Sequence, residues 1–171
     1  LDHRVKGEKM VLLQLCQELG RQLTVVGDLP PEEILDSGVN LLPFTPDREQ
    51  FKLLLLSHKN LIFLSEIDTY SLLALEALAS GIPSIVPRTG GPADLVAHGR
   101  TGYVIDIFNA EQLNQIINLH HERTDRKQMR IAARDSVSMR TWNRINSELK
   151  THYLDVINQK KSANLSEIGV A

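Results

Sequence analysis

Apolar residues recur along the chain in two spacings, one typical of buried strands and one typical of amphipathic helices. The run Leu61 to Leu64 is apolar throughout, which indicates a strand buried on both faces of a parallel sheet. Ser71 to Ser80 follows with helical spacing, and Gly81 stands where a helix C-cap is expected. The same reasoning predicts further strands at residues 22–27, 39–44, 83–87 and 101–105. It also predicts a first helix that ends at residue 20, and helices at residues 31–36, 47–57 and 93–97.

Strands that alternate with helices predict an α/β protein with a Rossmann-like, doubly wound parallel sheet. After Ala110 the pattern changes, and three C-terminal helices are predicted at residues 111–122, 125–137 and 142–157. The length of 171 residues and a hydrophobic content of 42% fit a single well-buried domain. We expect this domain at residues 1–158 and a flexible tail at residues 159–171. The abrupt start beside a helix suggests a piece of a larger protein.

Composition excludes several classes of protein. A net charge of -2 gives no reason to expect nucleic acid as a partner. The single cysteine, Cys16, cannot form an intrachain disulfide, which favours a cytoplasmic setting, and no apolar run approaches the roughly 20 residues that span a bilayer. His120 and His121 are adjacent rather than helically spaced, so we expect no metal site and no metal cofactor.

Four predicted loops follow the carboxyl ends of strands, where ligands bind in folds of this type. They begin at Gly27-Asp28, Leu42, Glu66 and Arg88. In the last of them, Gly90-Gly91 can bring backbone amides close to an anion, and the helix after Tyr70 directs its positive N-terminus to the same place. Taken alone, Gly90-Gly91 could form a turn that binds no ligand, whereas the four loops together favour a binding site for a diphosphate.

Glu76 is the least expected residue of the central helix, because the residues around it are apolar. Burial of an unpaired carboxylate costs several kcal/mol, so a partner is needed. Ligand hydroxyls could supply it. The alternatives are an ion pair with a neighbouring loop, or a side chain that reaches solvent.

Together these segments resemble the C-terminal, donor-binding domain of retaining glycosyltransferases with the GT-B fold, the glycosyl transferases of group 1 or family 4. The resemblance covers nearly the whole chain. Its most specific part runs from Ser65 to Pro83. Asp68, in Asp-Thr-Tyr-Ser, and Glu76 are similar to the family's acidic pair, and Glu76-Ala-Leu-Ala-Ser-Gly-Ile-Pro83 is similar to its Glu-Ala-Met-Ala-Ser-Gly-x-Pro run. Thr89-Gly-Gly-Pro-Ala-Asp94 and Gly99-Arg-Thr-Gly-Tyr-Val104 look like two further family segments, in the expected order.

The resemblance implies roles for individual residues. Glu76 would hold the ribose hydroxyls of a nucleoside diphosphate sugar, and Asp68 would contact hydroxyls of the transferred hexose. The backbone of Thr69, Tyr70, Ser71 and Leu72 would meet the sugar and the diphosphate, together with Gly90 and Gly91. Leu42, Phe44 and Thr45 would border the base.

The family also uses an Arg and a Lys near the start of this domain to neutralise the diphosphate. Two registers compete for them. In one, Lys6 is that lysine and its Arg lies before Leu1; in the other, Arg4 and Lys9 form the pair. In the remaining alternative, all three residues only flank a helix start. We prefer Lys6, because the apolar pattern of the first helix then needs a single inserted residue.

Three residues depart from the family pattern. Asp68 replaces the commoner Glu, Ser71 stands where Gly is common, and Pro43 stands where the base-binding loop usually has Gly. With these departures the resemblance does not identify the donor sugar. Two alternative functions therefore stand beside glycosyl transfer: a nucleotide-sugar epimerase and a non-catalytic nucleotide-sugar-binding module.

The expected partners are a nucleotide sugar, a missing N-terminal acceptor domain of the same protein, and a glycan or lipid acceptor. The isolated chain is expected to bind donor without transferring sugar. Arg126, Arg130 and Arg134 form a stripe that fits either a solvated face or lipid phosphates, so a location in the cytoplasm or at the inner face of a membrane is expected.

Overall fold

The structure, a computed structural model, describes residues 11, 14–15, 17, 23–27, 39–65, 67–106 and 110–167. The chain divides into two units, residues 1–137 and 138–171, and each is described by itself. Within the described residues of the first unit, every strand pairing is parallel and helices alternate with strands, which confirms the predicted α/β class.

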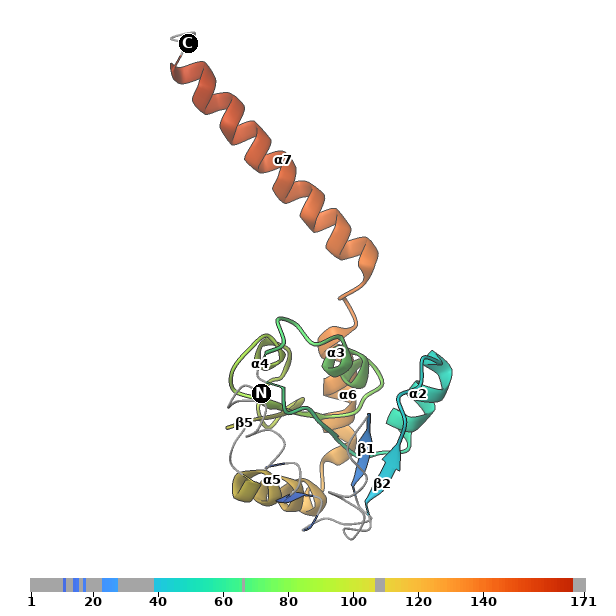
Figure 1. The fold of residues 1–171 in the computed structure, drawn as a ribbon. Helices are drawn as coiled ribbons and strands as arrows, with labels where there is room; N and C mark the ends of the chain where they lie inside the picture. The colour runs from blue at the N-terminus through green and yellow to red at the C-terminus, as the bar shows by residue number, and fades with distance from the viewer. Residues whose placement is uncertain are drawn as a thin grey trace. The chain divides into compact units, whose positions relative to one another are not determined.

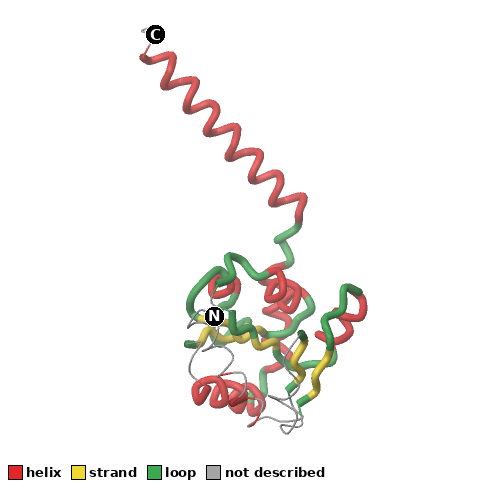
Figure 2. Tube along the Cα trace, viewed as in Figure 1, coloured by secondary structure: helices red, strands yellow, loops and turns green. Residues whose placement is uncertain are grey.

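The strands form two parallel sheets (Figures 1 and 2). One contains two strands and the other contains three in the order β3-β4-β5. The bounds are β1 (Thr24–Val26), β2 (Asn40–Leu42), β3 (Leu61–Ile62), β4 (Ser84–Pro87) and β5 (Gly102–Ile105). β3 is shorter than the predicted strand, and its two residues are only half-buried, because β3 is the edge of the three described strands and pairs with β4 alone.

The helices of the described chain also follow the predicted order. Asp47 caps the helix that begins at Arg48 by accepting hydrogen bonds from the amides of Glu49 and Gln50. The bounds are α2 (Arg48–Leu56), α3 (Leu72–Ala79), α4 (Pro92–Leu95), α5 (Ala110–Glu122), α6 (Arg126–Val137) and α7 (Trp142–Glu167). Gly81, which was predicted to end α3, follows its last residue and the C-cap Ser80 in the left-handed conformation, with φ +70°.

The three-stranded sheet is covered by helices on both faces (Figure 1). Successive residues of a strand point to opposite faces, so Ile85 and Val86 enter different cores. Ile85 packs with Tyr103 and with residues of α5 such as Leu113. Val86 packs with residues of α3, α4 and α6: Ala74, Leu78, Leu95, Ala133 and Val137. This two-sided burial is the doubly wound arrangement that the sequence predicts.

The second unit contains α7, which continues past Asn158 to Glu167. The predicted end at Ile157 followed the apolar stripe of this helix, whereas the helix continues through Gln159, Lys160 and Lys161, which are good helix formers. None of the helices in the described part of the chain is both long and apolar enough to cross a bilayer. The domain boundary at residue 158 stays a prediction.

Candidate functional site

The turn that joins β3 to α3 is closed by the side chain of Asp68. Its Oδ1 accepts hydrogen bonds from the amide of Tyr70, at 2.9 Å, and from the amide of Ser71, at 2.7 Å. Aspartate forms this local turn readily because its short side chain reaches amides two and three residues ahead. The predicted acidic residue of the turn is therefore engaged with its own backbone.

The loop after β4 lies directly against this turn. The amide of Gly91 donates to the carbonyl oxygen of Asp68 at 3.0 Å. A Cβ atom on Gly91 would lie 1.8 Å from the carbonyl oxygen of Thr69 and 2.8 Å from the nitrogen of Tyr70. Only glycine permits this approach. Two of the four predicted loops therefore meet, and the positions of the other two relative to them stay predictions.

These contacts show which amides of the two loops already have an acceptor in the protein, namely those of Tyr70, Ser71 and Gly91. The contact of this backbone with a sugar or a diphosphate stays a prediction. Gly90 is exposed with φ +82° and remains a candidate for anion contact. Helix N-termini leave their first amides without intrahelical acceptors, so Leu72 at the start of α3 also remains a candidate.

Glu76 is exposed, which agrees with the alternative of a side chain that reaches solvent, so the carboxylate does not need the partner that burial would require. The apolar residues of α3 divide between two sides: Ala74, Ala77 and Leu78 are fully buried, whereas Leu72 is 59% exposed. Leu72 and Glu76 are four residues apart and share one helix face. The carboxylate thus lies on an open face that starts at the Asp68 turn, where it is available to a ligand without requiring one.

Ser71 has an unusual backbone conformation. Its φ is 59°, the one positive value outside glycine in the described part of the chain, and it is only 2% exposed. Its Oγ accepts a hydrogen bond from the amide of Ala74 at 3.2 Å and so caps α3. Glycine is common here in the family that the sequence resembles, and the left-handed conformation explains why glycine suits the position.

The predicted base-binding segment follows β2. Phe44 is 74% exposed and Leu42 38% exposed, so both offer apolar surface. The Thr45 hydroxyl accepts a hydrogen bond from the amide of Asp47 and donates one to Gln50 Oε1. It is therefore bonded to residues at the start of α2. Leu42 and Phe44 are therefore better placed than Thr45 to border a base.

The predicted diphosphate-binding residues Arg4, Lys6 and Lys9 lie outside the described residues, as do Cys16, Asp28, Glu66 and the predicted helix at residues 31–36.

One pair near the site was not predicted. Arg88 Nε donates to Asp106 Oδ1 at 3.2 Å, and both side chains are largely exposed. Each residue follows the carboxyl end of one of two neighbouring parallel strands, so strand register is the signal that could have found the pair.

Among the described residues, the ionisable groups with shifted pKa values lie outside these two loops. Burial lowers the pKa of His120 to about 4, and the positive charges of His121 and Arg123 act in the same direction. Its Nδ1 lies 3.5 Å from the Tyr103 hydroxyl in the core on the α5 side of the sheet. Hydrogen bonding to Arg123 lowers the pKa of Asp125. Across the described residues, no group of three His, Cys, Asp or Glu side chains is placed to hold a metal ion; that the chemistry needs no metal stays a prediction.

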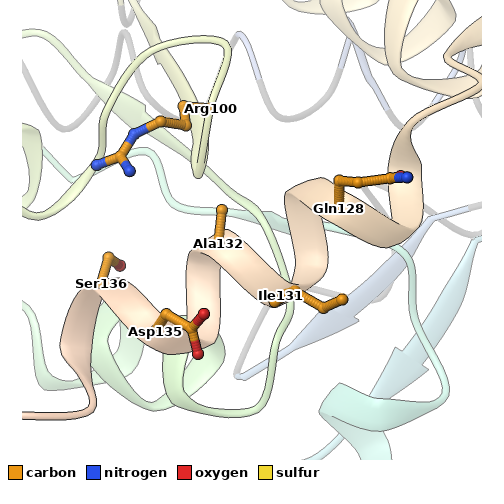
Figure 3. Close-up of a pocket in the computed structure, with 6 residues that line it drawn as sticks. All are labelled: Arg100, Gln128, Ile131, Ala132, Asp135 and Ser136. Atoms are coloured by element: carbon orange, nitrogen blue, oxygen red, sulfur yellow. The ribbon is translucent and has the colours of Figure 1, made fainter.

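A pocket of about 390 Å³ lies between the turn before β5 and α6 (Figure 3). It contains none of the predicted site residues. It is lined by Arg100, Gln128, Ile131, Ala132, Asp135 and Ser136.

Comparison with known proteins identifies the family and the fold. Residues 14–136 match the model of the family "Glycosyl transferases group 1". The chain belongs to this family. It is 33% identical, over 156 residues, to a GDP-mannose-dependent alpha-mannosyltransferase of Mycolicibacterium smegmatis, with 90% of this chain and 40% of that protein covered. The resemblance found in the sequence is thereby confirmed.

Two solved structures share the fold. Sucrose-phosphate synthase from Thermosynechococcus elongatus matches with a TM-score of 0.73 and 21% identity, covering 92% of this chain and 44% of that one. Anabaena HepE in complex with UDP-glucose matches with a TM-score of 0.69 and 19% identity, covering 86% and 45%. This group 1 chain therefore has the fold of a C-terminal-type domain of GT-B glycosyltransferases, and it spans less than half the length of the relatives that it matches.

Proposed function

We propose that this chain is the donor-binding half of a retaining glycosyltransferase. It binds a nucleoside diphosphate hexose, and the hexose passes to a glycan or lipid acceptor held by a domain outside the chain. We place the protein in the cytoplasm or at the inner face of a membrane. The observation that carries the proposal is the exposed carboxylate of α3: Glu76 lies one turn beyond Leu72 at the start of the helix, in a chain of this family.

The electrostatics of the reaction support this assignment. Departure of the nucleotide develops negative charge on the diphosphate, and preorganised positive groups stabilise that charge most effectively. Lys6 is the preferred cation, with Arg4 and Lys9 as the alternative pair. The Gly90 amide and the N-terminus of α3 add partial positive charge. Cations from the protein would thereby fill the role of a metal ion.

The relatives support the class of donor. One is named as dependent on GDP-mannose, and one solved neighbour contains UDP-glucose. Both are nucleoside diphosphate hexoses, in which ribose hydroxyls sit between the base and the diphosphate. A carboxylate on an open helix face beside a diphosphate site is suited to accept hydrogen bonds from those hydroxyls.

Titration calorimetry of the Glu76→Ala variant tests the ribose assignment. Loss of hydrogen bonds to a charged group costs roughly 1.5–3 kcal/mol, so affinity for GDP or UDP should fall by about 10- to 100-fold. Affinity for inorganic pyrophosphate, which has no ribose, should change little.

The matched control is Glu111→Ala, which removes another exposed helical glutamate on α5, at the opposite face of the sheet. It should change neither affinity. Equal weakening of nucleotide and pyrophosphate by Glu76→Ala would remove the ribose assignment, and absence of nucleotide binding by the unsubstituted chain would remove the proposed function itself.

A further inference from the structure

Asp68 has two candidate roles that make different demands on its carboxylate. As a sugar ligand it must direct at least one oxygen away from the protein. In the structure, Oδ1 is directed back into its own turn and accepts two short hydrogen bonds, from the amides of Tyr70 and Ser71. Hydrogen bonds from amides to a carboxylate are stronger than those between neutral groups.

The main chain of the same turn holds the neighbouring loop. The carbonyl oxygen of Asp68 accepts the Gly91 amide, and Gly91 packs against the Thr69 carbonyl more closely than any side chain would permit. The turn thus joins the loop after β3 to the loop after β4. A change in the shape of the turn must move both loops.

The turn also sets the direction of the first amides of α3. Ser71 is buried, its amide donates to Asp68, and its φ of 59° is unfavourable for a residue with a Cβ atom. Without an acceptor at Asp68, the Ser71 amide would be left buried and unpaired, and the residue would be driven toward negative φ. The start of α3, with Leu72, would then turn away from its present direction.

The length of the side chain agrees with this role. An aspartate reaches amides two and three residues ahead in its own turn. A glutamate, the commoner residue in the family resemblance, carries its carboxylate one methylene farther and does not fit the same pair of amides without a shift of the backbone.

We propose that Asp68 is a positioning residue, which closes the turn at residues 68–71 and holds it against Gly91 so that the Gly90 loop and the start of α3 face the donor diphosphate together. This inference rests on the proposed function. Asp68 then acts through Ser71 and Gly91, so that the effect of substituting it does not depend on the transferred sugar.

Three substitutions in the full chain separate the two roles. Asp68→Asn keeps an acceptor oxygen at Oδ1, Asp68→Ala removes it, and Asp68→Glu keeps the charge but moves it. Binding of GDP, UDP, GDP-mannose and UDP-glucose is measured by calorimetry. Hydrogen exchange at the amides of Tyr70 and Ser71 is measured without ligand.

A positioning role predicts that Asp68→Ala and Asp68→Glu lower affinity for all four ligands at least tenfold. The factor should be the same for GDP as for GDP-mannose, and for UDP as for UDP-glucose, because each pair shares its diphosphate. Asp68→Asn should stay within about threefold of the unsubstituted chain. Exchange at Tyr70 and Ser71 should accelerate in the Ala variant and be restored in the Asn variant.

The control for a purely structural effect is Thr101→Val. It removes the hydrogen bond from the Ala97 amide to Thr101 Oγ1 in another turn, away from the site. It should lower the denaturation midpoint without changing nucleotide affinity. Loss of affinity for the nucleotide sugar alone in Asp68→Ala, or an Asn variant as weak as the Ala variant, would overturn the positioning role. An unsubstituted chain that binds none of the four probes would instead overturn the proposed function.

Discussion

Ser71 offers a direct test of backbone strain at the head of α3, because two small substitutions there should act in opposite directions. Ser71→Ala removes the cap on the Ala74 amide but keeps a Cβ atom at a φ of 59°. Ser71→Gly also removes the cap, but it relieves the steric conflict between Cβ and the backbone.

The magnitudes follow from these two terms. Loss of a helix cap to alanine costs about 1 kcal/mol of unfolding free energy, whereas loss to glycine costs a few tenths. A residue with a Cβ atom in the left-handed region costs roughly 1–2 kcal/mol. Ser71→Ala should therefore destabilise the chain by about 1 kcal/mol, and Ser71→Gly should stabilise it by about 1 kcal/mol.

Urea denaturation of the full chain measures both changes as shifts of the midpoint. Glycine is a better cap than alanine at any helix start, so the comparison needs a reference position. Asp47 provides it, because it caps α2 through two amides with an ordinary φ of -75°. The stability difference between the glycine and alanine variants should be larger at Ser71 than at Asp47 by about 1 kcal/mol. Equal differences at the two positions would refute the claim that Ser71 is strained.

Two further predictions concern other parts of the first unit. Gly91→Ala should lower affinity for UDP or GDP at least tenfold, because the added Cβ would displace the Thr69 carbonyl. The control Gly99→Ala, with φ +75° and no atom within 4 Å of the added Cβ, should lose stability but not affinity. Calorimetry measures both affinities, and equal values for the two variants would contradict the close approach of Gly91 to the Thr69 carbonyl. Stability should fall as the pH drops from 6.5 toward 4, because the unfolded chain protonates His120 near 6.5 while the folded chain resists protonation down to about 4. The unfolding free energy should fall by on the order of 2–3 kcal/mol between pH 7.5 and pH 4.5, as measured by denaturation curves. A His120→Gln variant should not show this fall, and the same acid sensitivity in that variant would contradict the assignment to His120.

Local patterns were sufficient for most of the described elements. The capping residue Asp47 and the apolar face with Leu55 locate α2, and Gly81 marks the end of α3, because these signals act between residues a few positions apart. The alternation that sends Ile85 and Val86 into different cores is equally local. The motif around Asp68 and Glu76 was specific enough to identify the family before any geometry was known.

The tertiary structure decided what those site residues contact. The exposure of Glu76 depends on which face of α3 packs against the sheet, and all faces of that helix are mainly apolar, so periodicity could not select one. The engagement of the Gly91 amide depends on the distance between two loops far apart in the sequence. The sequence by itself determined the order of elements, the family and the identity of the chemical groups, because these depend on short-range pattern. Only the packed structure determined which amides are already satisfied and which carboxylate is open to a ligand, because hydrogen bonding and burial depend on neighbours that the chain brings together from a distance.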